Sequence, residues 1–304
     1  MQLEISAIGR IAQQVFSGVN RATIWGVTSR GVFLHIPSGW MVFLSGENCH
    51  GPLTVNLGGN VKPLLSLVPG SSVAIHDSHL SFQNLGIDLH FENAIPWEPP
   101  ALPGSALARA ARQNRLFSTI QAVSKDSPLN ARKGLLREVL VTLKEWGAME
   151  VKDERSSQFF SHPELFRLIL ALNRDEPAAL GEALAPFIGR GSGLTPSGDD
   201  LLVGLLLTLN RWGLQLYPTL ELRIQMLNRA AIKASHLKTT LLSANLIECA
   251  ALGQADERLI AALDGLIAGV GDANACASCL LDWGSSSGSD ALAGITLALM
   301  AINP

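Results

Sequence analysis

One short pattern occurs twice in the sequence, and its residue types are suited to holding a negatively charged ligand. The first copy, Gly189–Asp200, is rich in glycine and runs into the apolar segment Leu201–Leu209. The second copy, Trp283–Asp290, comes ninety residues later and runs into Ala291–Leu299. Both copies fit Ser-Gly-x-Asp-x-Leu-x-Gly-x-x-Leu-x-Leu, with seven identities in thirteen positions. This repetition predicts one unit used twice, a glycine-rich loop that opens a buried helix.

The two apolar segments predict helices that pack against each other. They are apolar on nearly all sides, as enclosed helices are. Gly204 and Gly294 occupy the same place in each copy, although a glycine inside a helix costs ~1 kcal/mol relative to alanine. Close contact between the helices accounts for both glycines, because a side chain would not fit there. We therefore expect a crossing at Gly204 and Gly294, with both N-termini facing a common cleft.

Two converging helix N-termini predict a composite site for phosphate or carboxylate. Each terminus leaves four backbone N–H groups unpaired and carries about half a positive charge. Glycines allow a ligand to approach those groups closely. Arg190 and Lys238 are the candidate cations, and the candidate hydroxyl donors are Ser192, Ser197, Ser285, Ser286 and Ser287.

The aspartates of the two copies allow two further interpretations. Ser197-x-x-Asp200 and Ser287-x-x-Asp290 have the form of helix capping boxes, and Thr195-Pro196 that of an N-cap followed by the first helical residue. Capping leaves the alternating glycines at 189, 191 and 193 unexplained. Alternatively, Asp199, Asp200 and Asp290 hold Mg²⁺, because hard cations take oxygen ligands and often retain substrate phosphates. No acidic motif at a fixed metal spacing accompanies them.

A proline-rich segment divides the elements that position this motif into two groups. Asn93–Ser105 contains four prolines and predicts a linker. Residues 1–95 predict a small antiparallel β barrel or sandwich, and residues 105–304 an all-helical domain with two central buried helices, which together make an α+β fold. The expected strands are short β-branched or aromatic runs: Thr23–Trp25, Val32–Ile36, Met41–Leu44, Leu53–Leu57 and Val73–His76.

Helical periodicity begins after the linker. Besides the two copies, the expected helices are 105–124, 127–146, 161–173, 219–234, 240–252 and 256–268. The first three start at a serine, and Ser161–Glu164 has the form of a capping box with proline in the first turn.

Three other groups of chemically active residues have simpler interpretations. His76–His79 predicts a polar hairpin turn rather than a metal site, because no third ligand stands at a diagnostic spacing. Cys276 and Cys279 predict helix packing rather than redox chemistry, since no second pair exists for zinc. Cys49 and His50 predict a loop, because adjacent side chains on an extended chain point apart.

Composition excludes several classes of protein. Of the 304 residues 47% are apolar and 16% charged, which excludes intrinsic disorder. The net charge of −3 and the lack of a basic run argue against partners such as nucleic acid or a membrane surface. Four cysteines form no disulfide framework, and the N-terminus does not have the pattern of a signal peptide. We therefore expect a cytoplasmic protein without a transmembrane segment.

Three motifs together resemble the bacterial AllH-like family, whose best-known member is a subunit of the oxamate carbamoyltransferase of anaerobic allantoin degradation. They are Gly191–Gly204, then Thr239-Thr240-x-x-Ser243, then Gly284–Gly294, in the order found in the family. The resemblance covers the helical domain well and the β domain loosely. Ser285 stands where the family commonly has a histidine. The Ser-Thr-Arg-Thr-Arg loop of aspartate and ornithine carbamoyltransferases is missing from the sequence.

The resemblance implies a transferase reaction in which oxalurate and phosphate give oxamate and carbamoyl phosphate, carried out with other subunits. Loops 191–198 and 284–288 would each hold an anion, and Lys238 or Arg190 would neutralise developing charge. The catalytic candidates are Asp200, Asp290 and Lys238. The substrate-binding candidates are Arg190, Gly191, Gly193, Thr195, Ser197, Gly198, Thr239, Thr240, Ser243, Gly284, Ser285, Ser286, Ser287 and Gly288.

Two alternatives to this transferase stay open at the level of sequence. One is a small-anion binding or sensor module without chemistry of its own. The other is a Mg²⁺-dependent enzyme that uses the three aspartates, with Mg²⁺ as its cofactor.

Overall fold

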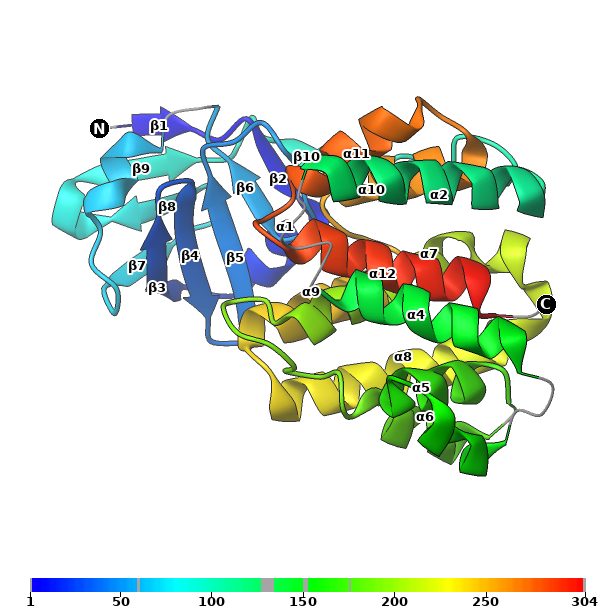
Figure 1. Cartoon of the computed structure of the whole chain (residues 1–304). Helices are drawn as coiled ribbons and strands as arrows, with labels where there is room; N and C mark the ends of the chain where they lie inside the picture. Colours follow the sequence, from blue (N-terminus) through cyan, green and yellow to red (C-terminus); the bar gives the residue numbers. More distant parts are fainter. Residues whose placement is uncertain (1, 59–60, 127–133, 150–152, 175, 303–304) are drawn as a thin grey trace. The chain divides into compact units, whose positions relative to one another are not determined.

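The computed structural model describes residues 2–58, 61–126, 134–149, 153–174 and 176–302 (Figure 1). The chain divides into two compact units, Met1–Pro100 with Ala255–Glu257, and Ala101–Gln254 with Arg258–Pro304. The described strands all belong to the first unit, and the second is built from helices. The predicted fold class, α+β with strands first and helices after, is confirmed.

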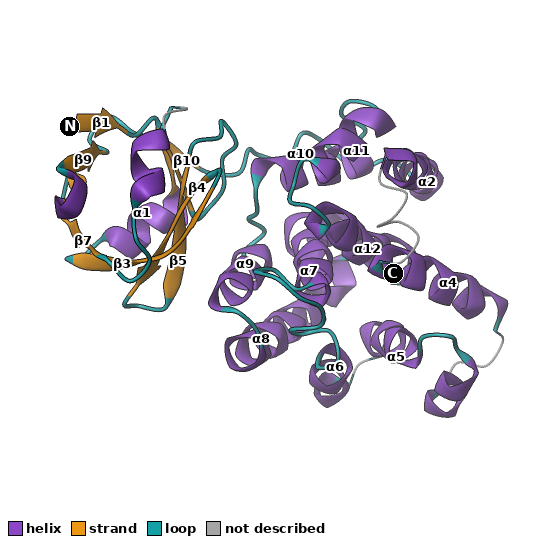
Figure 2. Ribbon diagram, turned by 60° about the vertical axis from the view of Figure 1, so that its left-hand side comes forward, coloured by secondary structure: helices purple, strands orange, loops and turns teal. Residues whose placement is uncertain are grey.

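A curled sheet of ten described strands forms most of the first unit. Its order is β1-β9-β8-β7-β3-β4-β5-β6-β2-β10, and helix α1 (Arg10–Phe16) lies within its curve (Figure 2). Val32, Leu34 and Ile36 of β4 alternate toward the core and are fully buried. The strands are β1 (Gln2–Glu4), β2 (Ala7–Gly9), β3 (Arg21–Thr28), β4 (Gly31–Ile36), β5 (Trp40–Ser45), β6 (Thr54–Asn56), β7 (Ser72–Ile75), β8 (His79–Phe82), β9 (Ile87–His90) and β10 (Ile95–Trp97).

The five predicted strands correspond to β3–β7, and the sheet is mixed rather than purely antiparallel. Pairs β1–β9, β2–β10 and β5–β6 run parallel. The strands that the sequence did not reveal have three or four residues each, too few for alternation to be visible. The predicted linker is too long at its start, because Ile95–Trp97 forms β10. Pro96 is tolerated there since β10 is an edge strand.

The two polar segments of the first unit lie in turns and loops, as predicted. His76 N–H donates to the His79 carbonyl at 2.9 Å and closes the turn between β7 and β8. The His79 ring stacks between His76 and His90, with centroids 4.4 and 5.2 Å away. Cys49 and His50 lie between β5 and β6. Among the described residues, no group of three or more His, Cys, Asp or Glu side chains could hold a metal ion.

The second unit is a helical bundle around two central helices, α7 and α12, which pack against each other (Figures 1 and 2). Helices α8 and α9 pack on α7, and α4, α11 and α2 pack on α12. The helices are α2 (Arg109–Asp126), α4 (Leu135–Ala148), α5 (Pro163–Leu172), α6 (Pro177–Leu184), α7 (Ser197–Leu216), α8 (Glu221–Lys238), α9 (Leu241–Ala251), α10 (Glu257–Ala268), α11 (Ala273–Leu281) and α12 (Ser287–Met300). The described 3₁₀ turns are 62–66, 83–85, 154–159 and 218–220.

The expected serine caps do not form where the structure describes them. Helix α2 begins at Arg109, not at Ser105, and the expected start at Ser127 lies outside the described residues. Ser161 donates its hydroxyl to Glu145 of α4, at 2.5 Å, so His162 becomes the N-cap of α5. Helix α9 does begin as expected, because the Thr240 side chain accepts the Ser243 N–H at 3.1 Å.

The helices also bear on the expectations for the cysteine pair and for membrane-spanning segments. Cys276 of α11 is buried, as the packing interpretation predicts, and Cys279 is half-buried. Within the described part of the chain, none of the helices combines the length and apolar character needed to cross a membrane.

Candidate functional site

The two copies of the motif meet where α7 and α12 cross, as predicted from their glycines. A Cβ atom on Gly204 would lie 2.0 Å from the carbonyl oxygen of Ala291. A Cβ atom on Gly294 would lie 1.9 Å from the carbonyl oxygen of Leu201. Each glycine therefore lets the backbone of the other helix approach directly.

The glycines at the helix starts serve packing as well. A Cβ on Gly198 would lie 1.9 Å from the Phe187 carbonyl oxygen, and one on Gly288 1.7 Å from the Leu280 carbonyl oxygen. Both glycines are buried. Gly198 and Gly288 are predicted substrate contacts. In the structure, the side of each residue where a Cβ would stand lies against the protein backbone.

Several N–H groups of the first turns are already used, which corrects the simplest form of the anion hypothesis. Gly198 donates to Arg190 O at 2.8 Å, and Asp199 and Asp200 both donate to Pro196 O. In the second copy Gly288 donates to Trp283 O at 3.1 Å. The carbonyls of Arg190 and Trp283 in the preceding loops, and that of the N-cap Pro196, accept these bonds, so these N–H groups do not point at a ligand.

The loops before the helices are exposed and contain strained positions that only glycine adopts readily. Gly189, Gly191 and Gly193 have φ values of 74°, 119° and 99°, and Gly284 has 73°. This accounts for the alternating glycines. Residues 191–194 and 284–285 are exposed to solvent, and they form the accessible part of the two copies.

The side chains at the two helix starts reach across to the opposite copy instead of capping their own helix. Thr195 and Ser287 contact each other through their hydroxyls, at 3.1 Å. The N-cap of α7 is Pro196, and neither it nor Ser286, the N-cap of α12, makes a side-chain cap bond. Thr195 was expected to cap α7, and that interpretation is wrong because the helix starts two residues later.

We call the place where the two helix starts meet, at Thr195 and Ser287, the junction. The carboxyl groups of Asp200 and Asp290 lie inside it. They are 1% and 2% exposed. Burial raises the pKa of Asp200 well above its usual range; the nearby hydroxyls of Ser287 and Thr195 lower it in part, and the charge of Asp290 raises it further. Burial also raises the pKa of Asp290, against hydrogen bonds from the Ser197 hydroxyl and the backbone N–H of Leu135, the first residue of α4. The N-terminus of α4 therefore reaches the junction too.

Asp199 differs from its neighbours in having partners for both oxygens. Its Oδ1 accepts the Gly189 N–H at 2.8 Å, and its Oδ2 accepts the Thr239 hydroxyl. Burial raises the pKa of Asp199, and these two bonds, with one from Ser243, lower it in part. Asp199 therefore ties the start of the glycine loop to the end of α8.

The Thr-Thr-x-x-Ser segment holds the glycine loop from its other side. Thr240 donates its hydroxyl to the Leu194 carbonyl at 2.7 Å, and Ser243 donates to the same oxygen at 3.4 Å. Lys238 is exposed, and its carbonyl oxygen would be 2.7 Å from a Cβ on Gly189. In this structure Thr239, Thr240 and Ser243 thus position loop 189–195.

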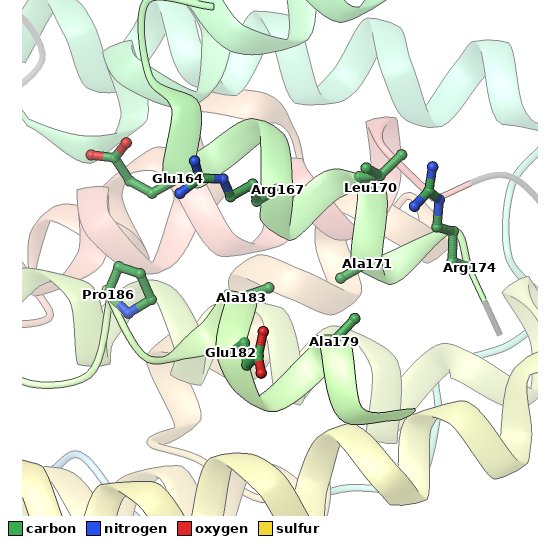
Figure 3. A pocket seen from close by; sticks show the side chains of 9 residues that line it. All are labelled: Glu164, Arg167, Leu170, Ala171, Arg174, Ala179, Glu182, Ala183 and Pro186. Carbon is green, nitrogen blue, oxygen red and sulfur yellow. The ribbon is translucent and has the colours of Figure 1, made fainter. Parts of the chain in front are cut away.

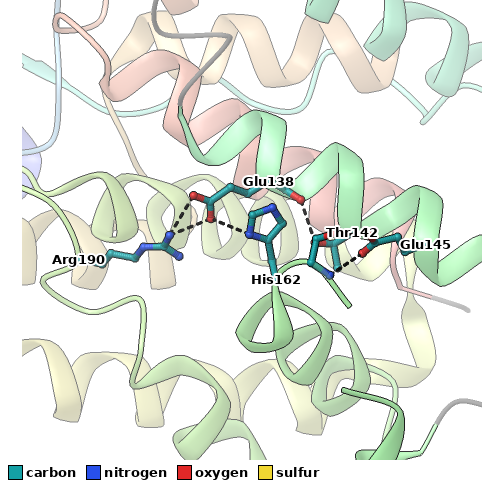
Figure 4. A network of polar contacts seen from close by, with 6 residues as sticks. Glu138, Thr142, Glu145, His162 and Arg190 are labelled. Carbon is teal, nitrogen blue, oxygen red and sulfur yellow. Dashed lines mark hydrogen bonds and ion pairs between the residues drawn. The ribbon is translucent and has the colours of Figure 1, made fainter. Parts of the chain in front are cut away.

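Arg190 already has a carboxylate partner that the sequence did not reveal. Its Nη2 donates to both oxygens of Glu138 in α4, at 2.9 and 3.0 Å, and His162 lies 3.8 Å from the same carboxylate (Figure 4). Glu138 stands in the first turn of α4. An acidic residue near a helix start is common, so no local signal could have identified it as the partner of Arg190.

We expect Arg190→Met to lower the unfolding free energy by about 1 kcal/mol, because the pair is partly exposed and solvent weakens it. Glu138→Gln should cost a similar amount, and the double variant should cost little more than either single one. Urea unfolding of the three variants measures this coupling. Fully additive losses would show that the two side chains do not act on each other.

A separate pocket lies between α5 and α6, outside the motif (Figure 3). It has a volume of about 420 Å³. Arg167 projects from α5, Arg174 lies just after the end of α5, and Glu182 projects from α6. The pocket has leucine and alanine at its base and charged side chains of both signs around it. It therefore contains none of the glycine, serine and aspartate residues of the repeated motif.

Comparison with known proteins gives one match. No curated protein and no solved structure matches the chain significantly. The family model described as oxamate carbamoyltransferase subunit AllH matches residues 187–299, a range that spans both copies of the motif and the Thr239–Ser243 segment. The resemblance read from the three motifs is therefore confirmed, and over residues 187–299 the chain is similar to the AllH family.

Proposed function

We propose that the chain is a subunit of a complex that transfers a carbamoyl group between oxalurate and phosphate. The observation that supports this most is that the family match covers both copies of the motif. The 3.1 Å contact between Thr195 and Ser287 brings the same two copies together. A family described as a carbamoyltransferase subunit also implies further subunits as partners.

The reaction needs positioning and charge stabilisation more than a covalent nucleophile. A phosphate oxygen attacks the terminal carbamoyl carbon of oxalurate and forms a C–O bond. The C–N bond to the oxamate portion then breaks, and the departing nitrogen takes up the proton that hydrogen phosphate loses. The products are carbamoyl phosphate and oxamate.

The exposed loops are the parts of the chain that we assign to the substrates. Substrate contacts in this proposal come from Gly191, Gly193, Thr195, Gly284, Ser285 and Ser286, with Lys238 as the exposed cation. Asp200 and Asp290, buried at the starts of α7 and α12, are the catalytic acidic residues of this proposal. Arg190, Ser197, Thr239, Thr240, Ser243 and Ser287 are positioning residues, because each is bonded to another part of the loops or to an aspartate.

Reconstitution tests the proposal. The purified chain, alone and with the proteins encoded beside it, is incubated with oxalurate and phosphate, and carbamoyl phosphate is measured. We expect turnover in the reconstituted complex and at least about a 100-fold loss with Asp290→Asn, the size of effect that removal of one catalytic acid or base has. Asp290 is buried and accepts bonds from Ser197 and Leu135, so urea unfolding of this variant must show that the loss of turnover is not a loss of folding.

Asp272→Asn is the matched control. Asp272 caps α11 by accepting the Ala275 N–H at 2.8 Å, and asparagine caps equally well. It should leave both turnover and stability unchanged. Binding of oxalurate or phosphate without turnover in any combination of subunits would instead favour an anion-binding module, and equal turnover by wild type and Asp290→Asn would contradict the role given to Asp290.

A further inference from the structure

Asp200 is a buried acid whose two carboxyl oxygens make no hydrogen bond of normal geometry to a described residue, although the hydroxyls of Ser287 and Thr195 lie beside them. Both of its oxygens are inaccessible to solvent. A buried carboxyl group is costly unless it is paired, protonated or bound to a cation. Asp199, one residue earlier and equally buried, has a partner for each oxygen. The contrast points to something that only Asp200 binds.

The groups that surround Asp200 are oxygen donors from both copies of the motif. The hydroxyls of Thr195 and Ser287 lie close enough to lower the pKa of Asp200, and the charge of Asp290 raises it. Oxygen is the donor that Mg²⁺ prefers, and adjacent ligands at ~2.1 Å in an octahedron are about 3.0 Å apart. The Thr195 and Ser287 hydroxyl oxygens are 3.1 Å apart, so they already stand at that spacing.

Charge at the junction is unfavourable for a bare anion. Asp199, Asp200 and Asp290 are buried within it, and Glu138 raises the pKa of Asp290 from nearby. Arg190 is bonded to Glu138 through both carboxylate oxygens. Since several first-turn N–H groups already donate to backbone carbonyls, a phosphate at the exposed loops would face carboxylates beneath it. A cation between them removes that repulsion.

We propose that the carboxylates of Asp200 and Asp290, with the hydroxyls of Thr195 and Ser287, hold one divalent cation of the Mg²⁺ type. Its remaining coordination positions take water or a phosphate oxygen from the side of loops 191–194 and 284–285. The proposal of a bound cation depends only on the residues of the junction. The proposal of a phosphate ligand also depends on the proposed function.

Mn²⁺ is the probe for this site, because it replaces Mg²⁺ and its binding is measured directly by electron paramagnetic resonance. The full chain is stripped with EDTA, dialysed and titrated with Mn²⁺, and competition with Mg²⁺ is recorded. We expect one Mn²⁺ per chain, displaced by Mg²⁺. Lack of a bound Mn²⁺ signal, with and without inorganic phosphate, would overturn the proposal.

Asp200→Asn and Asp199→Asn form a matched pair at neighbouring buried positions. Asp200→Asn should weaken Mn²⁺ binding by more than the roughly 10–100-fold that loss of an outer-shell partner costs. Asp199→Asn should retain one bound Mn²⁺, with at most an affinity change of that outer-shell size, because its oxygens bind Gly189 and Thr239. Equal binding by wild type and Asp200→Asn would refute the site.

A second variant decides the question if Asp200→Asn does not fold. Ser287→Ala removes one proposed ligand and should weaken Mn²⁺ binding more than Asp199→Asn does, and an affinity no lower than that of Asp199→Asn would refute the site. Inorganic phosphate should tighten Mn²⁺ binding if a phosphate oxygen completes the coordination. If phosphate does not change the affinity for Mn²⁺, the phosphate ligand is refuted and the cation site is not. If the complex binds Mn²⁺ but transfers no carbamoyl group, the proposed function is refuted and the cation site is not.

Discussion

Gly204→Val should prevent the helical unit from folding at ordinary temperatures. The added side chain would begin 2.0 Å from the carbonyl oxygen of Ala291, which is backbone and cannot move aside as a side chain can. Overpacking of a core costs ~1–3 kcal/mol where side chains adjust and more where they cannot. Helices α7 and α12 would have to separate, and with them the two starts that carry Asp200 and Asp290. Far-UV circular dichroism and urea unfolding measure the loss.

Two further substitutions make this test specific. Gly294→Val should have the same effect, because its Cβ would meet the Leu201 carbonyl oxygen at 1.9 Å. Gly181→Ala in α6 is the control, since a Cβ there would meet nothing within 4 Å. It should stabilise the protein by about 0.5–1 kcal/mol, as alanine does in place of glycine inside a helix. Wild-type stability in Gly204→Val would show that the helices do not cross at this glycine.

The second large effect is expected at a buried ion pair between α7 and α10. Arg211 donates from Nε and Nη2 to the two oxygens of Asp264, at 2.8 and 2.6 Å, and Trp212 Nε1 donates to Oδ1 at 2.9 Å. The two charged side chains are 6% and 9% exposed. Arg211→Met would leave a buried carboxylate with one neutral donor. Loss of one partner of such a pair costs about 3–5 kcal/mol, which urea unfolding would measure as a lower midpoint.

A double variant separates the charge from the packing. Arg211→Met with Asp264→Asn removes both charges and keeps an acceptor for Trp212 Nε1. We expect it to recover most of the stability that Arg211→Met loses, because replacing both members of a buried pair is often nearly neutral. A double variant no more stable than Arg211→Met would mean that the cost lies in packing around Arg211 and not in the unpaired charge.

The sequence alone determined the repeat, the enclosed helices and their crossing. Glycine costs free energy inside a helix. Gly204 and Gly294 at equivalent places therefore predicted that the two helices touch there, and the structure confirms this contact. The α+β order followed from the change of period after the prolines. Strands of three or four residues, such as β1 and β10, gave no periodic signal and were missed.

Only the tertiary structure decided what the polar residues of the motif do. In the sequence, a serine three residues before an aspartate has the pattern of a helix cap. In the structure, Thr195 contacts Ser287 of the other copy, and Ser197 bonds Asp290. Likewise Arg190 was a candidate for binding substrate until α4 brought Glu138 to it. Local patterns report bonds within one turn of helix, whereas these partners are 52 to 93 positions away. They meet because α7 packs against α12, which joins the two helix starts, and because α4 packs on α12, which brings Glu138 to them.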